Sequence, residues 1–305
     1  MKTNKKLFGR ISIAIILIGG ISFITACSSE PEKTEETTTP EKEELNQAQQ
    51  VLYSMPSPFE LASLLKNSGA TFNKELINSP DNVSKYTTSK SRALNLGIYG
   101  ADLSYASIFA QTQEALKYLN CVKKLTEDLG ISQAFNSETM DRVNKTMQKK
   151  NDTERDDELQ QIVSEAYLTA NAFLKDNERA KTASLILAGG WVEGLYIAAS
   201  LSKKAEKNTD LLNMIAEQKF SLENLVALLE AYQDDQQVAE VLKDMNELMA
   251  IYSKVEESAT ATVEVKTDTA TNVTEVGGDS GLSLSPESAS EITSKIVVIR
   301  NMYVQ

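Results

Sequence analysis

Histidine is absent from the 305 residues, and cysteine occurs only at positions 27 and 121. Without histidine the chain cannot form a Ser-His-Asp triad, supply an imidazole base or bind zinc through imidazole. Two cysteines are too few for a thiolate metal site, and no Gly-rich phosphate-binding loop occurs. We therefore expect no catalytic residues, no metal and no cofactor, and hence a protein that is not an enzyme.

Basic residues are also in short supply. The chain has 31 Lys and Arg against 43 Asp and Glu, which gives a net charge of −12. An acidic surface disfavours nucleic acid and anionic lipid headgroups as partners. The partners that remain are cationic or uncharged molecules.

The first 27 residues have the features of a secretory signal. A basic start is followed by an apolar segment, Ile11 to Ile24, that is short and Gly-rich for a membrane span. The segment ends in Ile24-Thr25-Ala26-Cys27, which resembles the lipobox of bacterial lipoproteins. The resemblance implies a signal peptide over residues 1–26, cleavage before Cys27, and acylation of Cys27 by chains such as palmitate. Cys121 is then left without a disulfide partner, and its apolar neighbours predict a buried, inert thiol.

The residues after Cys27 predict a tether. Residues 27–45 are rich in Ser, Thr, Pro and Glu and cannot bury enough apolar surface to fold, so we expect a disordered acidic tether. Acidic residues close to the lipidated Cys are similar to surface-export signals of Bacteroidota lipoproteins. That similarity implies a lipid-anchored protein of the cell envelope, at the periplasmic or surface face of the outer membrane. The folded domain is expected over residues 46–305.

Two apolar stretches, Ala93 to Gln113 and Thr182 to Ser202, are the centre of the predicted fold. Each contains 21 residues and one charge, Asp102 in the first and Glu193 in the second. Small residues recur through both, at 93, 97, 100, 104 and 107 in the first, and this spacing predicts a seam against another backbone, because a glycine inside a helix is compensated only where another backbone comes close. The pattern predicts an all-α, multi-helix bundle around two buried helices rich in glycine and aromatic residues.

The rest of the domain has the 3.6-residue periodicity of amphipathic helices. One of these helices is predicted to start at Phe220-Ser221, with Ser221 as its N-cap. A last one is predicted to start at Ser285-Pro286 and to dock on the bundle through one apolar face, formed by Ala289, Ile292, Ile296, Ile299 and Tyr303. Between about 258 and 284 the sequence turns to Thr, Val, Ser and Gly, which predicts either a small β-hairpin or a loop. Asp102 and Glu193 are 91 positions apart in similar settings, so a diverged duplication is one interpretation.

The two acids define a candidate site. Each has a tyrosine three residues later, and the candidate residues are Asp102, Tyr105, Glu193, Tyr196, Tyr99 and Trp191. One interpretation is structural: a buried carboxylate must be paired, and Arg92, Arg142, Arg155 and Arg179 are candidate partners. The other is a small-ligand cleft between the central helices, because few polar groups among aromatic walls are typical of ligand sites.

The segments Leu94 to Ala106 and Leu187 to Ala199 resemble uncharacterised all-helical lipoproteins of Bacteroidota. This resemblance implies an envelope location and an all-α domain, and no particular activity. Imelysin-like lipoproteins are similar in size and location, but their His-x-x-Glu motif cannot exist here. We expect a non-catalytic binding or scaffolding role, with the membrane and an envelope protein as partners. A small-ligand-binding protein is the alternative, and an enzyme is the third and least favoured one.

Overall fold

The computed structural model describes residues 58–132, 137–149, 151–176, 179–202, 209–257, 262–268, 273–279 and 282–305. The predicted signal peptide (1–26), the tether (27–45) and the first twelve residues of the predicted domain lie outside these ranges. The described part is an all-α multi-helix fold, as the sequence predicts. A small β-structured segment precedes the last helix.

The helices follow one another along the chain as α2 (Pro58–Asn67), α3 (Ser89–Ile108), α4 (Thr112–Asp128), α5 (Ser137–Met147), α6 (Asp152–Asp176), α7 (Ala180–Ser202), α8 (Thr209–Glu230), α9 (Gln236–Tyr252) and α10 (Pro286–Tyr303). Two short 3-10 turns, η1 (Lys74–Leu76) and η2 (Pro80–Lys85), precede α3. The predicted helix start at Phe220-Ser221 is wrong. Helix α8 begins at Thr209 and runs through Ser221, so Ser221 is a helix-interior residue and not a cap.

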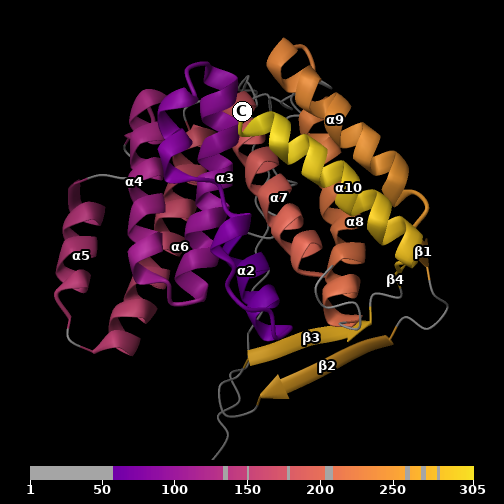
Figure 1. Cartoon of the computed structure of the whole chain (residues 1–305), viewed down its shortest axis with the longest axis horizontal. Helices are drawn as coiled ribbons and strands as arrows, with labels where there is room; N and C mark the ends of the chain where they lie inside the picture. Colours follow the sequence, from indigo (N-terminus) through magenta and orange to yellow (C-terminus); the bar gives the residue numbers. More distant parts are fainter. Residues whose placement is uncertain are drawn as a thin grey trace, which may run out of the picture. The chain divides into compact units, whose positions relative to one another are not determined.

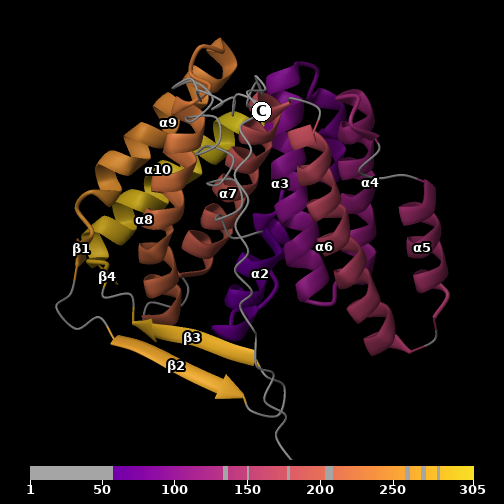
Figure 2. The same ribbon diagram turned by 180° about the vertical axis from the view of Figure 1, so that it is seen from behind.

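The two central helices are α3 and α7, as predicted. Helix α7 has α3 on one side, where α4 and α6 pack on α3. On its other side lie α8, α9 and α10 (Figures 1 and 2). Helix α5 packs on α6. Fifteen of the 20 residues of α3 and 17 of the 23 residues of α7 are buried. The two nearly apolar stretches are buried because other helices cover them on several sides.

Glycines let the backbones of α3 and α7 touch. A Cβ added to Gly97 would lie 1.9 Å from the carbonyl oxygen of Ile186, and one added to Gly189 would lie 2.0 Å from that of Leu94. The contact is reciprocal, because each glycine faces the carbonyl three residues before the other glycine. No residue with a side chain fits at either position without moving a backbone, which explains glycine inside these helices. Gly100, in contrast, has open space around it, so its predicted place in this contact is wrong.

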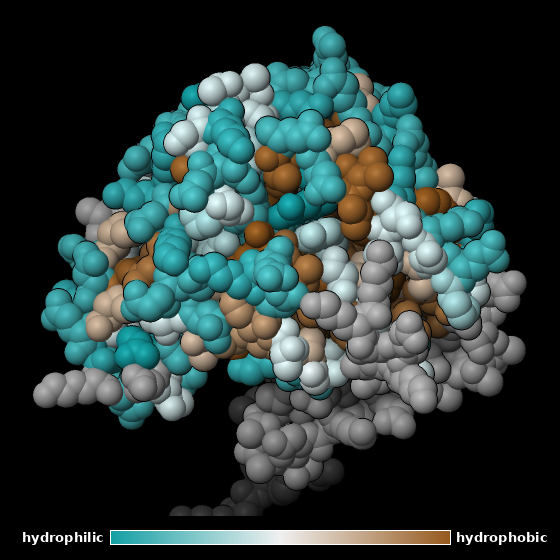
Figure 3. All heavy atoms as spheres, in the orientation of Figure 1, coloured by the Kyte–Doolittle hydropathy of each residue, from teal (hydrophilic) through white to brown (hydrophobic). Residues whose placement is uncertain are grey.

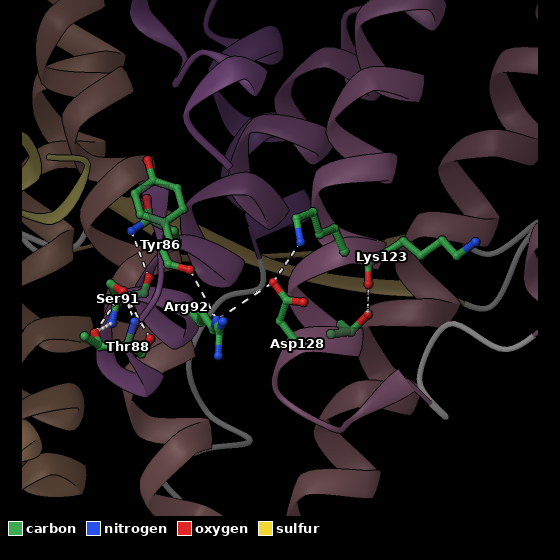
Figure 4. A network of polar contacts seen from close by, with 9 residues as sticks. Tyr86, Thr88, Ser91, Arg92, Lys123 and Asp128 are labelled. Carbon is green, nitrogen blue, oxygen red and sulfur yellow. Dashed lines mark hydrogen bonds and ion pairs between the residues drawn. The ribbon is translucent and has the colours of Figure 1, made fainter. Parts of the chain in front are cut away.

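The start of α3 is fixed by local polar contacts. Thr88 and Ser91 form a reciprocal capping box: the Thr88 hydroxyl accepts the Ser91 N–H, and Ser91 accepts the Thr88 N–H. Arg92, in the first turn, donates to the carbonyl of Tyr86 at 3.2 Å and lies 3.8 Å from Asp128 at the end of α4 (Figure 4). These contacts set the register of α3 against α4 and against the chain before it.

The segment between α9 and α10 contains a β-hairpin, one of the two predicted alternatives. Strand β2 (Thr262–Asp268) pairs antiparallel with β3 (Val273–Asp279), and Thr262 is opposite Asp279. A shorter pair, β1 (Glu256–Glu257) with β4 (Leu282–Ser283), leads the chain into α10. Ser285 then caps α10 by accepting the Ser288 N–H, and the predicted apolar face of α10 is buried at Ile292, Ile296, Ile299 and Tyr303.

Candidate functional site

Asp102 and Glu193 come together in the core. Each is fully buried, with 0% of its surface exposed. Helices α3 and α7 touch at Gly97 and Gly190 and run in the same direction from there. Asp102 comes five residues after Gly97, and Glu193 comes three residues after Gly190. Their carboxyl groups face each other at hydrogen-bonding range. The structure therefore places both predicted acids in one cluster.

Arg300 of α10 completes this cluster. Its Nε donates to Oε2 of Glu193 at 2.9 Å and its Nη2 donates to Oε1 at 3.0 Å, a bidentate ion pair. Nη2 also lies 3.4 Å from the carbonyl oxygen of Leu76, and the guanidinium lies 4.7 Å from the centre of the Tyr196 ring. Both oxygens of Glu193 are thus satisfied by one cation. Although burial alone would lower it, the charge of Glu193 raises the pKa of Arg300 above its usual value.

Asp102 has no such cation of its own. Its Oδ2 accepts the backbone N–H of Asn78 at 3.1 Å, while its Oδ1 receives no N–H or O–H from any described residue. Burial raises the pKa of Asp102 well above its ordinary value, and the nearby negative charge of Glu193 raises it further. Burial also raises the pKa of Glu193, but the Arg300 charge opposes that rise.

Buried amides extend the cluster towards the end of the chain. Asn78 Nδ2 donates to the Tyr86 hydroxyl at 2.9 Å, and Asn95 Nδ2 donates to the carbonyl oxygen of Tyr303 at 2.7 Å. Asn78 and Asn95 are themselves 3.4 Å apart through Nδ2 and Oδ1. This network ties α3 and the chain before it to the last turn of α10.

The arginines predicted as partners are not the partners. Among the described contacts, Arg142 pairs with Glu165, Arg155 lies 3.7 Å from Asp156, and Arg179 donates to the Leu129 carbonyl. Arg92 is occupied at the end of α4, as shown above. Sequence reasoning missed Arg300, Asn78 and Asn95. Arg300 left one signal, because it falls between Ile296, Ile299 and Tyr303 on the predicted buried face of the last helix, where a charge needs a partner.

The aromatic members of the predicted site have separate roles. Tyr105 accepts the Asn73 N–H at 3.0 Å and stacks on Phe72, so its hydroxyl does not serve Asp102. Tyr99 donates to the carbonyl oxygen of Ser79 at 2.8 Å. Trp191 is 6% exposed, and its indole N–H meets no acceptor among the described residues. Tyr196 contacts the acid cluster through the Arg300 guanidinium.

The acids do not open onto a described hollow. A shallow groove of about 630 Å³ lies on the surface of α9 and α10, lined by Ile251, Glu287, Ser290, Glu291, Ser294, Lys295 and Val298. A second, nearly filled void of about 10 Å³ lies between α3, α4, α5 and α6 and has an apolar lining apart from Ser107. Neither is lined by Asp102 or Glu193. The backbone contact at Gly97 and Gly189 also leaves no cleft between α3 and α7 at that level.

Two further tests bear on chemistry and location. In the described ranges, no three acidic or sulfur side chains gather closely enough to hold a metal ion. Helix α7 is long and apolar enough to span a membrane, but 83% of its most apolar window is buried against the rest of the protein. Comparison of the chain with protein-family models, curated proteins and solved structures found no match. The function must therefore be argued from the residues themselves.

Proposed function

We propose that the protein is a lipid-anchored, non-catalytic binding or scaffolding component of a bacterial cell envelope. The proposal that the protein is non-catalytic rests on one observation: Asp102 and Glu193 are shut off from solvent. Both acids have no exposed surface, and Arg300 occupies both oxygens of Glu193. Carboxylates that serve as acids, bases or ligand anchors must reach a substrate, and among the described residues these two reach each other, Asn78 and Arg300. The anchor part rests on the Ile24-Thr25-Ala26-Cys27 sequence.

The outer face of α10 is the best-supported binding surface. Val298 and Met302 lie one turn apart and are 52% and 46% exposed, two of the four large apolar side chains that are exposed in the described part. Val298 lines the groove between α9 and α10. Hydrophilic residues cover most of the described surface in Figure 3, and apolar residues emerge between them in separate places. Adjacent exposed apolar side chains rimmed by polar residues mark protein-binding surfaces, and Val298 with Met302 is the pair of this kind on one turn of helix in the described part.

The anchor is tested by Cys27→Ser. The variant should be unacylated and should appear in the soluble fraction, while the wild-type protein stays with the membranes and incorporates labelled palmitate. Cys121→Ser is the matched control, because Cys121 is buried in the core, and it should fractionate like the wild type. If Cys27→Ser remains fully with the membranes after a carbonate wash, the lipid anchor is wrong.

The binding surface is tested with a photo-crosslinking amino acid at Val298 in producing cells. A discrete adduct should form at position 298 and should be lost when Met302→Glu is added, because a charge next to the contact opposes desolvation. The same amino acid at Glu127, an exposed residue of α4, is the control and should give no such adduct. Equal adducts at both positions, or none at 298, would rule out this surface.

A further inference from the structure

Three charged groups meet in the dry centre of the described structure, and two of them are acids. With both acids ionised, Asp102, Glu193 and Arg300 would leave one negative charge in the core. Two carboxylate oxygens would then face each other with no hydrogen between them, because Oδ1 of Asp102 receives no other donor. Such an arrangement is strongly unfavourable in a buried site. One proton placed between the two carboxyl groups removes the excess charge and satisfies Oδ1.

We propose that Asp102 and Glu193 bind a single proton between them, and that this proton locks α3, α7 and the C-terminal helix α10 together. In this form Asp102 is a neutral acid that donates from Oδ1 to Glu193. Glu193 stays ionised and accepts from Arg300 as well. The cluster is then neutral, and all four carboxyl oxygens have a partner.

The proton belongs to Asp102 because the cation belongs to Glu193. Arg300 donates to both oxygens of Glu193 and to neither oxygen of Asp102. An adjacent positive charge favours the ionised form of a carboxyl group, and burial without one favours the neutral form. Asn78 contributes a single backbone N–H to Asp102, which a neutral acid also accepts through Oδ2.

The other titratable groups near Asp102 do not change their charge in the pH range where Asp102 loses its proton. Helix α7 contributes Glu193, α10 contributes Arg300, which lies over the Tyr196 ring, and α3 itself contributes Tyr99. Helix α4 contributes Tyr118 and Cys121, and Tyr86 comes from the chain before α3. Burial raises the pKa of Tyr86, Tyr99 and Tyr118 above the usual value for tyrosine, and it raises the pKa of Cys121 to about 11. These side chains therefore stay neutral in the range where Asp102 loses its proton.

Loss of the proton has a mechanical consequence for α10. An ionised Asp102 repels Glu193 and competes with it for Arg300, which holds α10 against α7. The last turn of α10 is fixed to α3 by the same cluster of polar contacts, through Asn95 and the Tyr303 carbonyl. We expect the C-terminal half of α10 to open more often when Asp102 is ionised, while its N-terminal half remains packed through Ile292 and Ile296.

Infrared spectroscopy detects the proton directly. Protein purified in mild detergent, with ¹³C-labelled aspartate, should show the C=O band of a protonated aspartic acid at neutral pH, far above the ordinary pKa of about 3.9. Asp102→Asn should remove that band. Asp244→Asn is the matched control, since burial also raises the pKa of Asp244, which accepts from Tyr303 outside this cluster. The proposal fails if no protonated band is present at neutral pH, or if Asp102→Asn leaves it unchanged.

The pH dependence of unfolding gives an independent readout. The folded protein holds a proton that the unfolded chain releases above about pH 4, so this contribution to stability is full below that pH and falls as the pH rises. Until the folded-state pKa is reached, the unfolding constant should rise by up to about tenfold per pH unit. In Asp102→Asn the unfolding constant should rise less steeply with pH, by a factor of up to about ten per pH unit. In Glu240→Gln, which removes an exposed ion pair with Lys90, the rise should be the same as in the wild type. Identical slopes for Asp102→Asn and wild type would overturn the proposal.

Hydrogen exchange tests the opening of α10. After correction for the intrinsic effect of pH, protection of the amides in the last two turns of α10 should fall at the pH where the infrared band disappears. The amides of α9, which contacts α10 but not the acids, should keep their protection. If α10 and α9 lose protection together, or α10 loses none while the band disappears, the mechanical part of the proposal is wrong.

Discussion

Helices α3 and α7 begin two similar series of four helices. In the first series α3 contacts α4 and α6, and α5 contacts α6; in the second α7 contacts α8 and α10, and α9 contacts α10. Each central helix contributes one glycine to the shared backbone contact and one fully buried acid. The series differ in their fourth helix, because α10 brings Arg300 to Glu193 and no described residue of α6 brings a cation to Asp102.

This difference shows that the environment, and not the residue type, decides the charge of a buried acid. Asp102 and Glu193 have the same chemistry, the same burial and a tyrosine at the same spacing. One has a bidentate arginine and is ionised, and the other has a single backbone donor and faces a negative charge. The two series are not alike in every contact, because α9 also packs on α8 and α7. The diverged duplication suggested by the sequence stays a prediction.

The glycine contact is the part that α3 and α7 share, and breaking it should destabilise both helices at once. Gly97→Ala places a methyl group 1.9 Å from the Ile186 carbonyl, so the helices must separate. Overpacking of this kind typically costs about 1–3 kcal/mol or more, and contact with rigid backbone favours the upper end. Gly100→Ala is the control: it meets open space, and alanine should stabilise the helix by up to about 1 kcal/mol. Chemical denaturation measures both, and equal effects would contradict the contact.

Removing the Arg300 cation should leave Glu193, like Asp102, without a counter-charge of its own. Arg300→Met leaves Glu193 buried without a counter-charge and should cost about 3–5 kcal/mol. Arg92→Met, at a partly exposed contact with Asp128, should cost no more than about 1 kcal/mol. The double variant Glu193→Leu with Arg300→Met should recover most of the loss, since a buried pair can be replaced by apolar residues of similar volume. If the double variant is as unstable as Arg300→Met, the loss does not come from a stranded charge.

Much of the fold followed from local patterns. The low charge of the two central stretches predicted their burial, and Ser285-Pro286 predicted the start of α10, because such signals depend on few neighbours. The start predicted at Phe220-Ser221 failed because a good cap residue within a continuous apolar stripe is overridden by packing, with Leu222 and Leu225 buried further along α8. The prediction that Gly100 takes part in the contact between α3 and α7 failed because helical spacing alone does not say which glycine faces the neighbouring backbone.

The site was harder to predict than the fold. Asp102 and Glu193 stood out as lone charges in apolar segments, but Arg300, the partner of Glu193, lies 107 residues further along the sequence. Pairing over that separation depends on how α10 docks, which periodicity does not specify. Asn78 and Asn95 gave no signal, because a buried amide is recognised only once the groups around it are known.

The smallest effect is expected from ligands. Trp191 lies on α7 two residues before Glu193 and is the only tryptophan, so its fluorescence reports on this region alone. Because Trp191 is 6% exposed, its emission should be blue-shifted and should move to the red on unfolding. A screen of sugars, peptides, lipids and cofactors should change neither the emission nor the melting temperature. A compound that shifts both in the wild type but not in Glu193→Gln would establish the ligand-binding alternative.

The most direct test of the account compares Asp102→Asn with Glu193→Gln at neutral pH in the same denaturation experiment. Asparagine has the shape of a neutral aspartic acid and donates from its amide to Glu193, but it releases no proton when the chain unfolds, so Asp102→Asn should raise the free energy of unfolding at neutral pH, by up to about 1.4 kcal/mol for each pH unit above about 4. Glu193→Gln leaves Arg300 buried without its counter-charge and should cost about 3–5 kcal/mol. Equal losses, or a larger loss for Asp102→Asn, would contradict the claim that one acid is neutral and the other charged.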